Sequence, residues 1–147
     1  MDSIKERMLQ LLQQLISIPS FSKEEQGTAA AITALLREYN IPVYRKGNNV
    51  WARNRHFNPT KPVILLNSHH DTVKPNAGYT RDPFAAIIEE DKLYGLGSND
   101  AGGALAALLA SFLYLYDSAD LNYNLVFAAT AEVEISGHGG VTKTRWW

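Results

Sequence analysis

The stretch Pro62-Val-Ile-Leu-Leu-Asn-Ser-His-His-Asp-Thr-Val73 joins a short apolar run to a group of polar, metal-binding side chains. The run shows no alternation of apolar and polar residues, which is typical of a β-strand buried on both faces. His69, His70 and Asp71 follow at the point where the chain leaves this strand. In open α/β sheets, ligands bind at the carboxyl ends of the strands. The stretch therefore predicts both an α/β fold and the edge of the sheet where the chemistry lies.

His69 and Asp71 have a spacing that suits a metal ligand and its partner. One ring nitrogen of His69 would bind the ion, and Asp71 would accept a hydrogen bond from the other, which fixes the tautomer and strengthens the ligand. His70 is expected to face elsewhere. Taken alone, the tripeptide is better explained as an ordinary His–Asp hydrogen bond in a surface loop, because short motifs have high false-positive rates.

Asp100 lies in a second segment of the same kind, Gly95-Leu-Gly-Ser-Asn-Asp-Ala-Gly-Gly103. An Ala- and Leu-rich helix is expected to follow, from Ala101 to about Tyr116. Asp is a favoured helix N-cap and Gly is common in tight turns, so capping is one interpretation. The other is a carboxylate that bridges two metal ions about 3.5–4 Å apart. Such a carboxylate needs closely packed backbone, which would account for the small residues on both sides.

Glu132 and Glu134 lie in a third segment, Ala131-Glu-Val-Glu-Ile-Ser-Gly137, after an apolar strand expected over residues 123–130. In an extended chain these two side chains point to the same face. Alone, they are readily explained as solvated acids at a strand end. Three segments that each carry imidazole or carboxylate groups at a strand exit nevertheless predict a divalent-metal site.

The rest of the chain alternates between helices and strands. Ser3 and Ser22 each have a glutamate three residues further on, the pattern of a capping box, so each is expected to begin a helix. Other apolar runs are separated by turn residues, which favours hairpins. The sequence predicts an α/β fold with a mixed, mostly parallel sheet flanked by helices. The further elements expected are helices over about 3–17 and 22–39 and hairpins over about 42–52 and 86–94.

Composition excludes several classes of protein. The chain of 147 residues is about one domain long, is 46% apolar and has a formal charge of −1, so we expect no nucleic acid or membrane as a partner. It has no cysteine, which excludes disulfides and thiolate zinc sites. The first residues do not resemble a signal peptide, and a cytoplasmic location is expected.

The three segments together resemble the N-terminal motifs of the M20-type metallopeptidases. The quoted matches are Ser-His-His-Asp-Thr-Val, Leu-Tyr-Gly-Leu-Gly-Ser-Asn-Asp-Ala-Gly-Gly and Ala-Glu-Val-Glu-Ile-Ser-Gly, and the resemblance extends to about residue 140. Within the family the chain looks most similar to acetylornithine/acetylcitrulline deacetylases. The resemblance implies an α/β catalytic domain interrupted by a smaller lid domain, two zinc or cobalt ions, and a homodimer formed through the lid. Residues 1–140 would be the N-terminal part of that catalytic domain.

The resemblance also implies a role for each site residue. His69 resembles the ligand of one metal and Asp71 its orienting partner. Asp100 resembles the bridging ligand, and Glu134 a ligand of the second metal. The reaction implied is metal-assisted hydrolysis of the amide bond of an N-acyl amino acid such as N-acetylornithine or N-acetylcitrulline, a step of arginine biosynthesis.

One departure from the family pattern concerns the general base. The family motif carries two adjacent acids, a base followed by a metal ligand, whereas here Val133 occupies the base position. Valine cannot accept a proton, and loss of general acid–base assistance typically costs about 10²–10⁴-fold in rate. Glu132 is a candidate substitute base, although its side chain should project in a different direction.

A second departure concerns the ligand set. The family supplies another acidic ligand some two dozen residues after the glutamate pair and a histidine near the C-terminus, and this sequence contains neither. Residues 141–147 do not resemble a family continuation and are expected to be an aberrant tail. We therefore expect the 147-residue form to be inactive or nearly so. The alternatives are a dipeptidase or aminopeptidase of the same family, and a non-catalytic pseudoenzyme that binds metal weakly.

Overall fold

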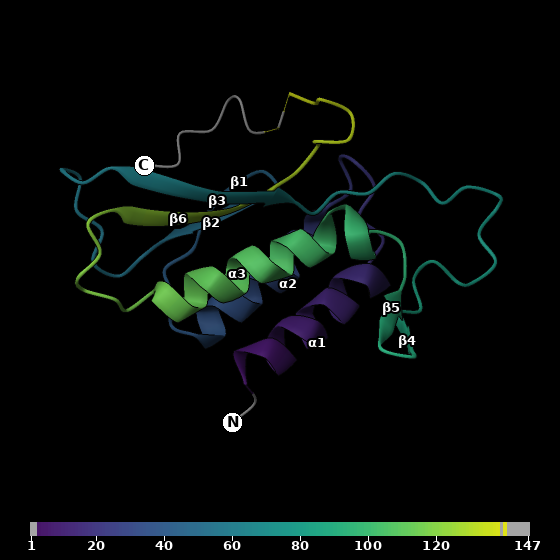
Figure 1. The fold of residues 1–147 in the computed structure, drawn as a ribbon. Coiled ribbons are helices and arrows are strands. Elements are labelled where there is room, and N and C mark those ends of the chain that lie inside the picture. Colours follow the sequence, from purple (N-terminus) through teal and green to yellow (C-terminus); the bar gives the residue numbers. More distant parts are fainter. Residues whose placement is uncertain (1–2, 139, 141–147) are drawn as a thin grey trace.

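Within the described part of the chain, the fold consists of one mixed sheet, three long helices and a small separate hairpin (Figure 1). The computed structural model describes residues 3–138 and 140. The expected tail, residues 141–147, lies outside this part of the chain. The helices are α1 (Ile4–Ser17), α2 (Gln26–Glu38) and α3 (Gly103–Leu115), with a short π-helical turn, η1 (Ser98–Gly102), before α3. The strands are β1 (Tyr44–Lys46), β2 (Asn49–Arg53), β3 (Val63–His69), β4 (Ile87–Glu89), β5 (Lys92–Tyr94) and β6 (Asn124–Thr130).

The main sheet has the strand order β1-β2-β6-β3. Strands β3 and β6 are parallel and in register from the pair Val63–Asn124 to the pair His69–Thr130, so both end at the same edge. The β1–β2 and β2–β6 pairs are antiparallel. The predicted mixed α/β sheet is confirmed, but its parallel share is smaller than expected, because β2 pairs antiparallel with both β1 and β6.

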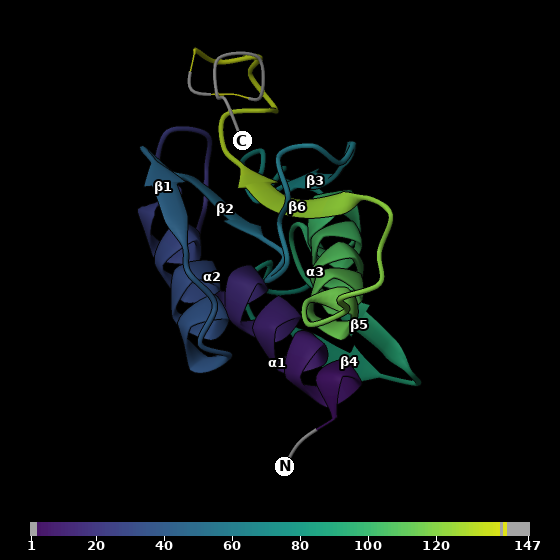
Figure 2. The ribbon, with the colours of Figure 1, turned by 90° about the vertical axis from the view of Figure 1, so that its left-hand side faces the viewer.

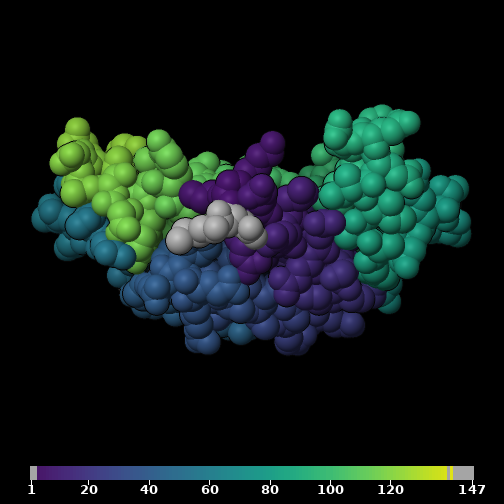
Figure 3. Space-filling model, turned by 90° about the horizontal axis from the view of Figure 1, so that it is seen from below, coloured from purple at the N-terminus to yellow at the C-terminus, as the bar shows by residue number. Residues whose placement is uncertain are grey.

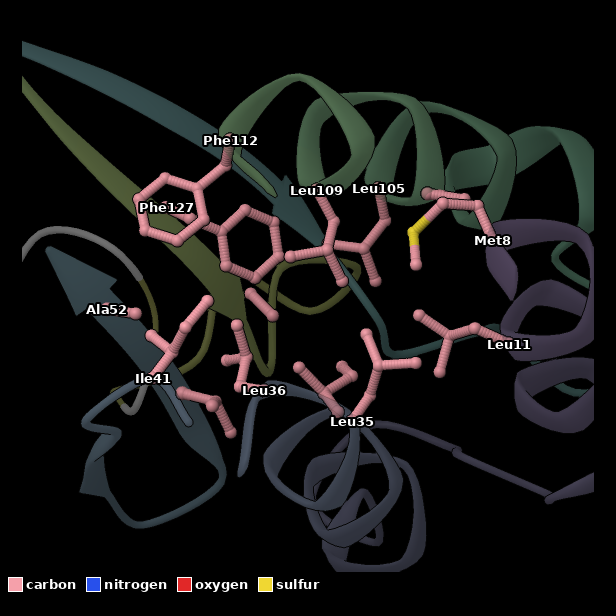
Figure 4. Close-up of a cluster of buried hydrophobic side chains, with 14 of the residues drawn as sticks. Met8, Leu11, Leu35, Leu36, Ile41, Ala52, Leu105, Leu109, Phe112 and Phe127 are labelled. Atoms are coloured by element: carbon pink, nitrogen blue, oxygen red, sulfur yellow. The ribbon is translucent and has the colours of Figure 1, made fainter. Parts of the chain in front are cut away.

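The three long helices cover one face of this sheet (Figures 1 and 2). Successive side chains of β6 point to opposite faces of the sheet. Phe127 packs in the core between the sheet and the helices, whereas Val126 packs on the other face with Trp51. Figure 4 shows Leu109 and Phe112 of α3 directed towards the side chains of α2 and β6. Seen from the helix side, α1 runs across the middle of the surface and the β4–β5 hairpin projects at one end (Figure 3). No helix within the described residues is long and apolar enough to cross a bilayer.

The helix starts test the capping predictions. At α1 the capping box is present, because Glu6 N donates to Ser3 Oγ and Ser3 N donates to the Glu6 carboxylate. At α2 the capping prediction is wrong: the helix begins at Gln26, and no side chain caps it. Ser22 instead donates its hydroxyl to Asp71, 49 residues away. The two serines have the same local pattern, so the difference arises from tertiary contacts.

Candidate metal centre

The parallel pairing of β3 and β6 brings the three predicted segments together. His69 is the last residue of β3 and pairs in register with Thr130, the last residue of β6. Asp100 lies in the turn before α3, and Glu134 follows β6. Each of His69, Asp100 and Glu134 offers a ligand atom, and these atoms all lie within 4.8 Å of one another. The structure thus brings together the three residues that the sequence proposed as metal ligands.

The imidazole of His69 lies between two carboxylates. Its Nδ1 is 3.0 Å from the Asp71 carbonyl oxygen and 3.4 Å from Asp71 Oδ1. Its Nε2 is 3.1 Å from Asp100 Oδ1. Contact at Nδ1 fixes the orientation of the ring and leaves Nε2 facing the cluster, which is the arrangement of a metal-binding histidine supported by a carboxylate.

Asp71 anchors the chain that carries Glu134. Its carboxylate is fully buried and accepts hydrogen bonds from Ser22 Oγ (2.7 Å), Val133 N (3.1 Å) and Glu134 N (3.0 Å). Burial raises the pKa of this carboxyl, but the hydrogen bonds from His69, Ser22 and these two backbone amides outweigh it and lower the pKa from 3.8 to about 2. Asp71 is therefore an ionised acceptor that ties β3, the segment before α2 and the chain after β6 to one point.

The pKa values of the two adjacent histidines are shifted in opposite directions. The hydrogen bond to the Asp71 side chain raises the pKa of His69 from 6.5 to about 9, against the opposing effect of burial. Burial lowers the pKa of His70, whose Nδ1 lies 2.8 Å from Thr28 Oγ1 and whose Nε2 donates to the Asn48 carbonyl. His70 thus faces away from the cluster, as the sequence analysis proposed.

We expect these pKa shifts to be visible in the metal-free chain. In an NMR titration the ring of His69 should titrate near pH 9 and that of His70 below 6.5. Because the folded-state pKa of His69 is raised, its contribution to stability is complete below pH 6.5 and disappears as the pH rises towards 9. Unfolding experiments in urea across this window should therefore show a fall in stability that His69→Gln abolishes. A pKa near 6.5 for His69 would contradict this expectation.

Residues 131–134 do not continue the strand. β6 ends at Thr130, and Glu132 has a positive φ of 57°, so the expectation that Glu132 and Glu134 share one strand face is wrong. The chain turns here because its backbone amides bind buried carboxylates: Glu132 N donates to Glu25, whereas the next two amides donate to Asp71.

The turn also determines where the candidate base lies. The Glu132 carboxylate lies against Gly137, where an added Cβ would be 2.1 Å from Glu132 Oε2. Among the described residues, it is not part of the cluster of potential ligands. Val133, where the resemblance implies the general base, is 36% exposed. The structure therefore shows no carboxylate from residues 132 and 133 in the cluster.

Asp100 does not cap α3. The N-cap residue of α3 is Gly102, which makes no side-chain cap bond, so the capping interpretation of Asp100 is wrong. The Asp100 side chain is 79% exposed and its carboxylate faces His69. The small neighbours are explained by packing, because a Cβ on Gly102 would lie 2.6 Å from the Gly97 carbonyl oxygen.

Sequence reasoning missed the supporting roles of Ser22 and Glu25. The capping pattern had assigned both to the start of a helix, whereas the structure uses both to hold the site. The Glu25 bond to Glu132 spans 107 residues of sequence. No local signal distinguishes such a residue from a helix cap, because its neighbours in sequence, Lys23, Glu24 and Gln26, are polar as well.

The sequence model of Peptidase family M20/M25/M40 matches residues 65–145, more than half of the chain. The chain belongs to this family. Curated relatives of the chain include succinyl-diaminopimelate desuccinylases. That of Orientia tsutsugamushi (strain Boryong) is 33% identical over 97% of this chain and 39% of the relative, and that of Corynebacterium glutamicum is 34% identical over 87% and 34%. The chain spans about two fifths of the length of the relatives it matches.

Solved M20 structures show the same fold. The M20 family metallo-carboxypeptidase Sso-CP2 from Sulfolobus solfataricus has a TM-score of 0.69 at 28% identity, over 92% of this chain and 32% of that one. The YXEP protein of Bacillus subtilis, described as a dinuclear metal binding peptidase, has a TM-score of 0.65 at 20% identity, over 90% and 36%. The family and fold predictions are thus confirmed. The relatives named above are desuccinylases, so the narrower resemblance to acetylornithine deacetylases is not shown.

Proposed function

We propose that His69, Asp100 and Glu134 bind a divalent metal and belong to a centre that hydrolyses the amide bond of N-acyl amino acids. One observation carries the proposal. An imidazole and two carboxylates, contributed by three segments far apart in the sequence, converge within 4.8 Å where two parallel strands end. Ligands of α/β proteins bind at this edge of the sheet.

The residues fit a zinc or cobalt ion. Nitrogen and oxygen ligands bind zinc at about 2.0–2.2 Å, so the ligand atoms around one ion lie about 3–4 Å apart. The 3.1 Å separation of His69 Nε2 and Asp100 Oδ1 suits this geometry, and Glu134 needs only a small side-chain movement. Asp100 has a second carboxylate oxygen, with which it would reach a second ion, as proposed from the motif.

A divalent ion in such a site supplies Lewis acidity, which polarises an acyl carbonyl and lowers the pKa of water. Within the chain, Asp71 holds the ring of His69 through Nδ1 and fixes the backbone at Val133 and Glu134. The exposed Asp100 carboxylate leaves the centre open to a substrate from solvent. These residues bind and orient, but Val133 supplies no group that moves a proton.

The named relatives favour an N-succinyl amino acid as substrate, whereas the motifs favoured N-acetylornithine or N-acetylcitrulline. Both belong to amino-acid biosynthesis and share the same chemistry, cleavage of a linear amide next to a carboxylate-bearing carbon. A peptide is the alternative, suggested by the metallo-carboxypeptidase that is 28% identical. The acyl group therefore distinguishes the candidates.

Cobalt binding tests the proposed centre directly. Titration of the chain with Co²⁺, followed by visible absorption, should give a bound-ion spectrum. His69→Ala and Asp100→Ala each remove a candidate ligand. Each should weaken Co²⁺ binding by more than the roughly 10–100-fold lost when a residue that only hydrogen-bonds a metal ligand is replaced. His56→Ala removes an exposed histidine on another loop and should leave binding unchanged. Absence of Co²⁺ binding, or equal binding by His69→Ala, would refute the proposal.

The same samples test the chemistry. We expect the metal-loaded 147-residue chain to hydrolyse N-succinyl-diaminopimelate, N-acetylornithine and a dipeptide far more slowly than typical enzymes, whose turnover is roughly 1–10³ s⁻¹. The reason is the lack of a proton acceptor at position 133. Turnover in the typical range would contradict this expectation.

A further inference from the structure

Glu25 is a carboxylate buried beneath the candidate metal centre. Its side chain has no solvent exposure, although glutamate is almost never fully buried without partners. It lies at the N-terminus of α2 and makes no capping bond to that helix. A buried carboxylate that does not serve its own helix requires another explanation.

Three donors from three parts of the chain meet this carboxylate. Glu25 Oε1 accepts from Lys23 N at 2.7 Å and from Glu132 N at 3.1 Å. Glu25 Oε2 accepts from Asn48 Nδ2 at 2.8 Å. The carboxylate thus joins the start of α2, the turn between β1 and β2, and the chain after β6.

The contact with Glu132 completes a row of three anchored amides. Glu132 N binds Glu25, and the amides of Val133 and Glu134 bind Asp71. Consecutive amides held by two buried carboxylates leave this turn little freedom. The direction in which the Glu134 carboxylate leaves the turn, towards His69 and Asp100, depends on both anchors.

We propose that Glu25 is a positioning residue that sets the geometry of the metal centre by holding the Glu132 amide. The inference rests on the proposed metal-binding function of Glu134. Glu25 itself touches none of the candidate ligand atoms. It acts through the backbone from Glu132 to Glu134, as the partner of Asp71 on the other end of the turn.

Two substitutions separate the acceptor role of Glu25 from its shape. Glu25→Met keeps the length of the side chain and removes both acceptors, so the Glu132 amide is released. Glu25→Gln retains one oxygen for the two backbone amides, and Asn48 can reverse its own amide to pair with the new NH₂ group. Glu24→Met changes the exposed neighbouring residue and serves as the matched control.

The measurements are Co²⁺ affinity, the visible spectrum of bound Co²⁺, and amide hydrogen exchange in the metal-free chain. Glu25→Met should bind Co²⁺ about 10–100-fold more weakly, the range for groups that orient metal ligands, with a changed spectrum. Its Glu132 to Glu134 amides should exchange faster. Glu25→Gln and Glu24→Met should match the unsubstituted chain in all three measurements.

Two results would overturn the inference. One is a folded Glu25→Met chain with unchanged Co²⁺ affinity and spectrum. The other is unchanged exchange at the Glu132 amide. If Glu25→Met does not fold, Glu25→Asp takes its place, since it keeps a carboxylate near Lys23 but withdraws it from Glu132 by one methylene. Failure of the unsubstituted chain to bind Co²⁺ would refute the metal proposal and, with it, the effect of Glu25 on a metal centre. The exchange data would still decide separately whether Glu25 holds the Glu132 amide.

Discussion

Replacing Phe112 by alanine should lower the free energy of unfolding by about 3–5 kcal/mol, the usual cost of removing a buried phenylalanine side chain. Phe112 is fully buried in α3 and lies between Phe127 of β6, at a ring-centroid distance of 5.9 Å, and Tyr116, at 5.7 Å. Its removal leaves a cavity at the contact between the helix layer and the sheet (Figure 4). Loss of this magnitude is a large fraction of the stability of an ordinary domain.

Urea unfolding followed by circular dichroism measures this loss as a lower midpoint with an unchanged m-value. Tyr114→Ala provides the control, because Tyr114 is an aromatic residue of the same helix that is 79% exposed. Its substitution should change stability by no more than about 0.5 kcal/mol. Equal losses for Phe112→Ala and Tyr114→Ala would show that helix propensity, rather than core packing, dominates at α3.

The periodic parts of the fold could be predicted from sequence. The apolar run before His69 and the run ending at Thr130 are strands β3 and β6, and the two predicted hairpins are present as β1–β2 and β4–β5. These elements have patterns that repeat within a few residues. The share of parallel pairing was overestimated, because a central apolar strand has the same pattern whether its neighbour runs parallel or antiparallel.

The candidate ligands and Asp71, the partner of His69, could be predicted from sequence, but the support from Glu25 could not. His69, Asp100 and Glu134 stand at chain positions where residue type and strand exits point to metal chemistry, and the structure brings them together. Glu25 instead looked like part of a helix cap. Its partner Glu132 is 107 residues away, and no local pattern predicts such a contact.

The conformation after β6 was mispredicted for the same reason. A strand end with two glutamates at alternate positions favours an extended chain with both acids on one face. Two buried carboxylates from earlier in the sequence, Glu25 and Asp71, instead bind consecutive amides and turn the chain. Tertiary acceptors therefore decide the geometry of the segment that carries Glu134.

Asp71→Asn should be destabilising and should also impair metal binding. The buried Asp71 carboxylate accepts hydrogen bonds from Ser22, Val133 and Glu134. The asparagine side chain has only one acceptor oxygen, and its NH₂ group would face at least one of these donors. Buried donors left without acceptors cost about 1–3 kcal/mol each, so we expect a loss of about 2–4 kcal/mol. The loss of support for His69 should weaken Co²⁺ binding by roughly 10–100-fold.

The pH dependence of stability tests whether the ionised carboxylate of Asp71 causes the stability loss expected for Asp71→Asn. Because the pKa of Asp71 is lowered from 3.8 to about 2, its stabilisation is present above pH 3.8 and disappears as the pH falls towards 2. Asp71→Asn should lack this part of the decline in stability at acid pH.

Asp100→Asn is the matched comparison for Asp71→Asn. The Asp100 side chain is 79% exposed, so this substitution should weaken Co²⁺ binding and leave stability nearly unchanged. If both variants lost metal affinity with equal and small changes in stability, Asp71 would be only a local partner of His69. A stability loss confined to Asp71→Asn would show that this carboxylate holds the site and the fold together.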